Sequence, residues 1–219
     1  MTLLELARGP ALQVSLIVLV LGVVWRLAGL LLLPYKKDLS EPRQGGGSAL
    51  GGAAYTIIRR FWPHREVQDR VLFSHVMGYA FHIGLAVVVF GYTQHILFIR
   101  DVTGLSWPAL PNWVVYLAGA ITIGALVALL VRRLGHGVLR LLSGVDDYLS
   151  WLVTILPVIT GFLAVAHFGA RYETLLAVHL LTVELLLIWL PFGKLMHTFT
   201  FVFSRGFLGA RAAHKGAQT

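Results

Sequence analysis

The stretch TLLAVHLLTVELLLIWLPFGKLMHTFTFVF, residues 174–203, decides the fold class of this chain. Crossing a hydrocarbon core of about 30 Å takes about 20 helical residues, and this stretch is longer than that. Its only charged side chains are Glu184 and Lys194. The stretch therefore predicts a helix that spans a membrane.

The rest of the chain is apolar as well. With 57% hydrophobic and 13% charged residues, it has too little polar surface to coat a soluble globule. It also lacks the short alternating segments typical of a membrane barrel. We therefore expect an all-α integral membrane bundle of five transmembrane helices in a single membrane domain, 1–219, with a cytoplasmic loop at about 34–70. The expected helices are 11–33, 71–99, 113–131, 148–167 and 174–203.

The positions of the basic residues predict how the bundle is oriented. Cytoplasmic loops carry an excess of Lys and Arg. Three basic residues fall on one side of the expected bundle, Arg8, Arg100 and Arg171, and thirteen fall on the other. The N-terminus is therefore expected outside and the C-terminus in the cytoplasm. The thirteen are Lys36, Lys37, Arg43, Arg59, Arg60, Arg65, Arg70, Arg132, Arg133, Arg140, Arg205, Arg211 and Lys215.

The net charge and the absence of cysteine limit the kinds of partner that the sequence predicts. Topology accounts for most of the net charge of +8, so no nucleic acid is needed to explain it. Because the chain has no cysteine, it has no disulfide and no thiolates of its own for an iron–sulfur cluster. Any cluster that exchanges electrons with this chain must belong to another subunit.

Three segments outside the expected spans have a distinct composition. The Gly-rich segment 44–52 is expected to be flexible. The segment 53–62, AAYTIIRRFW, is expected either to lie among the lipid headgroups or to be a docking surface for a partner. The segment 103–112, TGLSWPALPN, predicts a structured cap between the second and third helices.

The histidines carry the chemistry of this chain, because a polar side chain in lipid needs a partner. Five of the nine fall within the expected spans: His75, His82, His95, His179 and His197. On one continuous helix, the separation between His179 and His197 corresponds to five turns, about 27 Å, and puts both rings on one face.

Two histidines on one face at different depths suit a stack of two haems, each held by imidazoles from two facing helices. Two other interpretations remain open. The histidines could bond to neighbouring helices as packing contacts, or they could relay protons.

Three segments resemble the gamma subunit of respiratory nitrate reductases and related quinol-oxidising cytochromes b. They are FHIGLAVVVFG at 81–91, LLVRRLGHGVLRLLSGVDD at 129–147, and VHLLTVELLLIWLPFGKLMH at 178–197. The resemblance covers all five expected helices. It implies two b-type haems held between the second and fifth helices, and quinol as the substrate.

The resemblance also implies individual ligands. By matching positions, His82 and His197 would bind the inner haem iron, and His179 would be one ligand of the outer haem iron. The family's other ligand on the second helix is replaced here by Tyr92. The family's quinol-site lysine at the start of the third helix is also absent.

Two residues could replace the missing ligand. His95 matches the depth of His179, whereas His75 lies on almost the same helical face as His82. We prefer His95 for the outer haem and keep His75 as its alternative; a protein with one haem stays open as well. Glu184, within the fifth span, would either bond to a neighbouring helix or accept a proton from quinol.

The expected function is that of a membrane-anchoring cytochrome b subunit in a respiratory oxidoreductase complex. It would transfer electrons between menaquinol or ubiquinol and the iron–sulfur clusters of a partner on the cytoplasmic side, without itself acting on the terminal substrate. The expected location is the cytoplasmic membrane of a bacterium or archaeon, in contact with lipid. The alternative is a haem-free membrane anchor or a transporter subunit.

Overall fold

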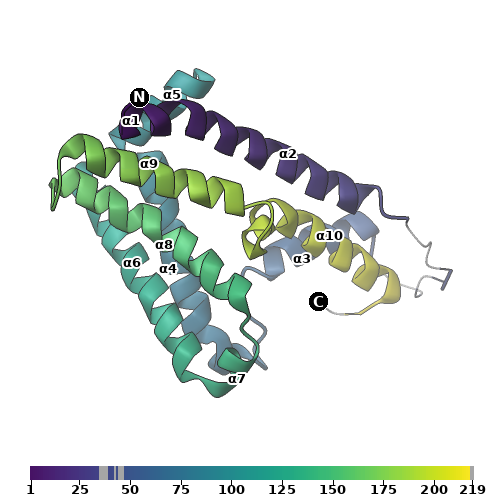
Figure 1. Cartoon of the computed structure of the whole chain (residues 1–219). Helices are drawn as coiled ribbons and strands as arrows, with labels where there is room; N and C mark the ends of the chain where they lie inside the picture. Colours follow the sequence, from purple (N-terminus) through teal and green to yellow (C-terminus); the bar gives the residue numbers. More distant parts are fainter. Residues whose placement is uncertain (35–38, 42, 44–46, 218–219) are drawn as a thin grey trace. The chain divides into compact units, whose positions relative to one another are not determined.

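The computed structural model describes residues 1–34, 39–41, 43 and 47–217. These residues are all-α, with no strand among them. Five helices are long and apolar enough to cross a membrane: Leu3–Leu31, Gln68–Gly91, Asn112–Gly135, Val145–Ala166 and Tyr172–Trp189. By length and composition, the chain is a multi-pass membrane protein (Figure 1). Its orientation across the membrane stays a prediction.

The helical elements follow one another along the described chain. They are α1 Leu3–Leu6, the π-helix η1 Ala7–Ala11, α2 Leu12–Leu31, α3 Ala49–Arg59, α4 Gln68–Gly91, α5 Thr93–Thr103, α6 Asn112–Gly135, α7 Gly137–Leu141, α8 Val145–Ala166, α9 Tyr172–Trp189, the 3-10 helix η2 Lys194–Met196 and α10 His197–Lys215. The helices α6 and α8 match the expected spans 113–131 and 148–167 to within a few residues.

The described chain divides into two compact units. Unit 1 comprises Met1–Gln13 and Val71–Leu186, and unit 2 comprises Val14–Arg70 and Leu187–Thr219. The single membrane domain expected from the sequence stays a prediction. Each unit is described by itself.

Close helix crossings hold unit 1 together. A Cβ atom on Gly84 of α4 would overlap the hydroxyl of Thr122 and lie 2.8 Å from the Ala118 carbonyl oxygen of α6. Gly119 of α6 leaves similar room for the ring of Phe162 on α8. Small residues let membrane helices approach closely in this way. Because lipid tails are as apolar as the side chains of the helices, the hydrophobic effect does not hold the helices together, and close packing stabilises their association instead.

Polar contacts join α6 to α8 as well. The indole Nε1 of Trp151 donates to the Leu126 carbonyl at 2.8 Å. Asp147, in the first turn of α8, accepts from the Gly144 amide at 3.0 Å and forms an ion pair with Arg133, also at 3.0 Å. The carboxylate thus satisfies a free amide at the helix N-terminus, where negative charge is stabilised. In Figure 1, α6 and α8 run side by side and α7 joins them at one end.

The prediction of one continuous helix over 174–203 is wrong. The first helix of this stretch, α9, ends at Trp189, and α10 begins at His197 after a turn and η2. Pro191 has no amide hydrogen to continue a helix, and its ring clashes with the preceding turn. The amides of Phe192 and Gly193 both donate to the Trp189 carbonyl, which closes the turn.

Unit 2 centres on a tight pairing of α3 with α10 (Figure 1). A Cβ atom on Gly52 would overlap the Gly209 carbonyl, and a Cβ atom on Gly209 would overlap that of Gly52. Thr56 is fully buried between them. Ile57 accepts from Arg205, so the start of α3 faces the later part of α10 and the two helices are antiparallel.

The predicted flexible segment 44–52 lies partly outside the described residues. Where the structure describes it, the prediction is wrong from Ala49 onward, because those residues begin α3. The Ser48 hydroxyl accepts from the Gly51 amide and caps the helix. The packing against α10 offsets the low helix propensity of Gly51 and Gly52.

Candidate cofactor site

A break in the chain at Tyr92 shapes the site in unit 1. The sequence predicts a continuous helix over 71–99, whereas α4 ends at Gly91 and α5 begins at Thr93. Tyr92, the N-cap of α5, has extended backbone angles of φ −81° and ψ 130°. The break turns the chain, so the direction of the His95 side chain does not follow from the helical register of α4.

The break frees carbonyl groups, because the last four carbonyls of a helix have no partner within it. Three of the four are satisfied by side chains and backbone from beyond the break. The Nδ1 of His95 bonds to the Val88 carbonyl at 2.8 Å. The Nε1 of Trp107 donates to the Phe90 carbonyl at 2.6 Å, and the Leu110 amide donates to the Gly91 carbonyl at 2.9 Å. The predicted cap at 103–112 is confirmed by these bonds.

The second side of the site is built by α8 and α9. The Nδ1 of His179 lies 3.2 Å from the hydroxyl oxygen of Thr160. Gly161 gives the imidazole room, because a Cβ atom at that position would lie 3.2 Å from the His179 Cε1 atom. The ring of His179 thus lies against α8, where it bonds to Thr160 and occupies the space that Gly161 leaves open.

The two imidazoles of His95 and His179 face one another in unit 1. Their ring centroids are 6.2 Å apart and their planes differ by 19°. Both residues are partly buried. Tyr92 packs edge-on against His95, with ring centroids 5.3 Å apart, and limits the rotation of that ring.

The hydrogen-bond partner assigns the proton of the His95 ring. A backbone carbonyl can only accept, so the Nδ1 of His95 carries the hydrogen that bonds to Val88. The neutral ring of His95 then has its lone pair on Nε2, which is the protonation state of a metal ligand. The Thr160 hydroxyl lies within hydrogen-bond distance of the Leu156 carbonyl, the Thr182 hydroxyl and Nδ1 of His179, so it can either donate to that nitrogen or accept from it.

The pair supplies two imidazoles that could hold a metal. Metal–imidazole bonds are about 2 Å long, so two rings that share one metal have centroids several ångströms apart, as these two do. Among the described residues no three His, Cys, Asp or Glu side chains cluster as a metal site. His95 and His179 are the residues that would hold a haem iron in unit 1, since imidazole is a ligand of haem iron.

His75, the alternative to His95, belongs to α4. Its ring packs edge-on against Tyr79, with centroids 4.8 Å apart. His95 rather than His75 makes the ring contact with His179. The choice of His95 stays a prediction, and the geometry favours it.

The two histidines expected at the inner haem are in different units, His82 in unit 1 and His197 in unit 2. The Nδ1 of His82 bonds to the Gly78 carbonyl at 2.7 Å, and that of His197 bonds to the Lys194 carbonyl at 2.8 Å. His197 is the first residue of α10, so it does not share a helical face with His179 as the sequence had suggested. Their pairing at an iron stays a prediction.

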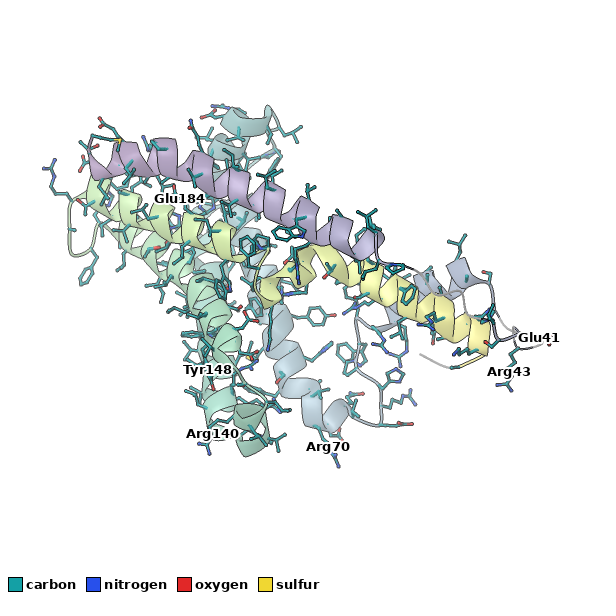
Figure 2. All side chains as sticks on the ribbon, turned by 45° about the vertical axis from the view of Figure 1, so that its right-hand side comes forward. Glu41, Arg43, Arg70, Arg140, Tyr148 and Glu184 are labelled. Atoms are coloured by element: carbon teal, nitrogen blue, oxygen red, sulfur yellow. The ribbon has the colours of Figure 1, made fainter. Side chains whose placement is uncertain are left out.

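Glu184 lies on α9 in unit 1 (Figure 2). The residue is 4% exposed, and its Oε1 atom has no hydrogen-bond partner among the residues that the structure describes. The hydrogen bond to a neighbouring helix, one of the two roles that the sequence predicts for this residue, is therefore not found at Oε1.

Sequence reasoning missed the residues that orient the ligands. Thr160 bonds to His179, and Tyr92 packs against His95. A hydroxyl group in an apolar span was the available signal for Thr160, since such groups often bond across helices. No comparable signal exists for Tyr92, whose position depends on the break in the chain.

The fold and this site define a multi-pass, all-helical membrane protein with a pair of facing imidazoles. No family model matches the chain, and no solved structure matches it. The chain is 34% identical over 212 residues to a protein of Nitratidesulfovibrio vulgaris strain Hildenborough that is described simply as a protein. The alignment covers 94% of this chain and 92% of that protein, so the chain belongs to the same family.

Proposed function

We propose that this protein is the membrane-anchoring cytochrome b subunit of a respiratory oxidoreductase complex. It transfers electrons between menaquinol or ubiquinol and the iron–sulfur clusters of a partner subunit on the cytoplasmic side, by way of two b haems. The observation that carries the proposal is the pair His95 and His179, with near-parallel rings 6.2 Å apart and Nδ1 atoms engaged by other groups. The location is the cytoplasmic membrane of a bacterium or archaeon.

The residues of unit 1 would prepare the outer site before a haem binds. The hydrogen bonds of His95 to the Val88 carbonyl and of His179 to the Thr160 hydroxyl would fix the orientation of the two rings, and the bond to Val88 would make the Nε2 of His95 more basic. Trp107 and Leu110 hold the end of α4 in place, so α5 presents His95 at a fixed position. A bound haem supplies one-electron chemistry that the side chains themselves lack.

The inner haem is part of the proposal through the resemblance of the sequence. His82 and His197 are its ligands by matching positions, and the Nδ1 atom of each bonds to a carbonyl of its own segment. This bond favours the same tautomer as in His95.

Glu184 is the candidate proton acceptor for quinol oxidation. Oxidation of a quinol releases protons as well as electrons, and an acid inside an apolar span is by default a functional candidate. The unpartnered and buried Oε1 atom of Glu184 supports this role over a packing contact.

The test combines haem content with spectra of single variants. The purified protein should contain non-covalent haem b in a pyridine haemochrome assay. His95→Ala and His179→Ala should each remove the same component of the reduced-minus-oxidised spectrum, because one iron needs both ligands. His75→Ala should retain both haems, as should the control His136→Ala in a segment outside the spans.

Two results would overturn parts of this proposal. A haem-free protein from cells that make haem would refute the cytochrome. Loss of a haem in His75→Ala, together with an unchanged spectrum in His95→Ala, would transfer the ligand role to His75 and assign His82 to the outer site.

A further inference from the structure

The first span has a narrow buried face. Two residues of α2 are buried, Ser15 and Gly22. They lie seven residues apart, so they share one face of the helix. Large apolar side chains of α2 are instead exposed, among them Val20, Leu21 and Trp25. The buried face of this span therefore consists of small residues.

Gly22 meets the turn that separates α9 from α10, and both belong to unit 2. A Cβ atom on Gly22 would lie 2.7 Å from the Cγ and 2.8 Å from the Cβ of Pro191. The side chain of Pro191 is fully buried. Because a proline ring is rigid and this one is enclosed, an added methyl group has to displace it. Gly84 and Gly119 of unit 1 meet neighbouring helices, whereas Gly22 meets a turn.

Bonds along the chain connect Pro191 to the start of α10. After the amides that close the turn, the Met196 amide donates to the Gly193 carbonyl at 3.2 Å, and Met196 is buried. The Nδ1 of His197, the first residue of α10, bonds to the Lys194 carbonyl at 2.8 Å. A displacement of Pro191 would therefore reach the imidazole of His197 within six residues.

We propose that the first span positions the expected ligand of the inner haem. Gly22 seats the ring of Pro191, this contact fixes the turn from which α10 starts, and the turn fixes the direction of the His197 side chain. Gly22 is thus a positioning residue that acts through the turn and touches no cofactor. This role rests on the proposed function, because it takes His197 as a ligand.

The test compares Gly22→Ala with Gly29→Ala in the purified full-length protein in detergent. A Cβ atom on Gly29 of the same helix meets nothing within 4 Å, so this control adds the same methyl group without a clash. Overpacking of a buried site typically changes an equilibrium constant by about tenfold to a hundredfold. In a haem titration we expect Gly22→Ala to weaken the inner site by about tenfold or more and to leave the spectral component of the outer haem unchanged. Gly29→Ala should match the wild type.

Amide hydrogen exchange detects the same contact without haem. In the haem-free protein, the amides of residues 192–197 should exchange faster in Gly22→Ala than in Gly29→Ala. A second variant, Pro191→Ala, removes the ring and leaves Gly22 in place. It should loosen the same amides and weaken the same haem.

The outcomes separate this role from the proposed function. Equal exchange in Gly22→Ala and Gly29→Ala would show that Gly22 does not hold the turn. Faster exchange with an unchanged inner haem would show that the turn does not position His197. Loss of both haems would mean that Gly22 serves the whole fold, which contradicts a specific role. A wild-type protein without haem would refute the cytochrome and the ligand role of His197, whereas the exchange comparison would still decide the contact.

Discussion

Five histidines among the described residues have Nδ1 within hydrogen-bond distance of an oxygen atom, and four of the five are the expected haem ligands; the other is His167, next to the Val165 carbonyl at 3.2 Å. For the four expected ligands, the bonding partners are three backbone carbonyls and one hydroxyl. The pairs are His82 with Gly78, His95 with Val88, His179 with Thr160 and His197 with Lys194. A bond from Nδ1 to a carbonyl selects the tautomer that leaves Nε2 for a metal, and ligating histidines almost always make a bond through their other ring nitrogen. The same local chemistry thus recurs at all four expected ligands.

Thr160→Val should weaken haem binding at the outer site. The substitution removes the hydroxyl that bonds to Nδ1 of His179 and changes the volume little. Loss of such a partner typically costs about tenfold or more in metal affinity. Haem titration of the apoprotein would measure the change.

A matched control lies on the same helix. The hydroxyl of Thr154 donates to the Ser150 carbonyl of α8 at 2.7 Å and should be dispensable for the haem. Equal affinity in Thr160→Val and Thr154→Val would show that the bond to Thr160 does not tune the ligand.

His197→Ala should remove the inner haem and leave the outer one. Quinol should then still reduce the outer haem, but electrons should no longer reach the partner subunit. Reduction by quinol is followed in the visible spectrum, and turnover is followed with the assembled complex. A variant with two haems and full turnover would show that His197 is not a ligand.

The choice between His95 and His75 shows what a sequence can reveal at single residues. The five histidines within the spans could be selected from their apolar surroundings. Their directions could not, because helical register predicts a direction only along a straight helix. On a straight helix His95 would face away from His82, and the break at Tyr92 removes that constraint.

At the level of elements, hydropathy predicted α6 and α8 well and missed two breaks. The polar residues Thr93 and Gln94 follow Tyr92, and Lys194 follows Pro191, but long apolar runs precede both breaks, so an average over a window as long as a span does not detect the turn. Pro191 and Gly193 gave a local signal for the second break. The first break depends on bonds from Trp107 and Leu110, which are distant in sequence.

Gly84→Ala should destabilise unit 1. The added Cβ atom would overlap the hydroxyl of Thr122 and press on the carbonyl of Ala118. Overpacking of this kind costs about 1–3 kcal/mol. Gly78→Ala on the same helix is the control, since a Cβ atom there meets nothing within 4 Å. Thermal unfolding in detergent would compare them, and equal midpoints would argue against a tight crossing of α4 and α6.

For the whole molecule, composition was sufficient to predict an all-helical membrane protein. It could not predict the pairing of α3 with α10, since that depends on the shapes of Gly52 and Gly209 rather than on polarity. Composition also does not reveal which end of the molecule faces the cytoplasm. Only the distribution of Lys and Arg along the sequence predicts this orientation. Figure 2 places Arg140 at the end of unit 1 where α7 leads towards α8.

The absence of cysteine allows a direct test of orientation, because each introduced thiol is unique. Leu105→Cys and Phe168→Cys should react with a membrane-impermeant maleimide in spheroplasts. Leu50→Cys and Leu141→Cys should react only after the membrane is disrupted. All four positions are well exposed, so accessibility to the reagent depends on the side of the membrane. The reverse labelling pattern would invert the proposed topology.

The facing pair of His95 and His179 also has a consequence for biosynthesis. The ligands belong to α5 and α9, and both α6 and α8 lie between them in the chain. A ribosome that has released α5 has therefore still to deliver two further spans before the second imidazole reaches the membrane. Under the proposed function, the outer haem can be captured only by a chain whose insertion is nearly complete, so cofactor loading acts as a checkpoint on assembly.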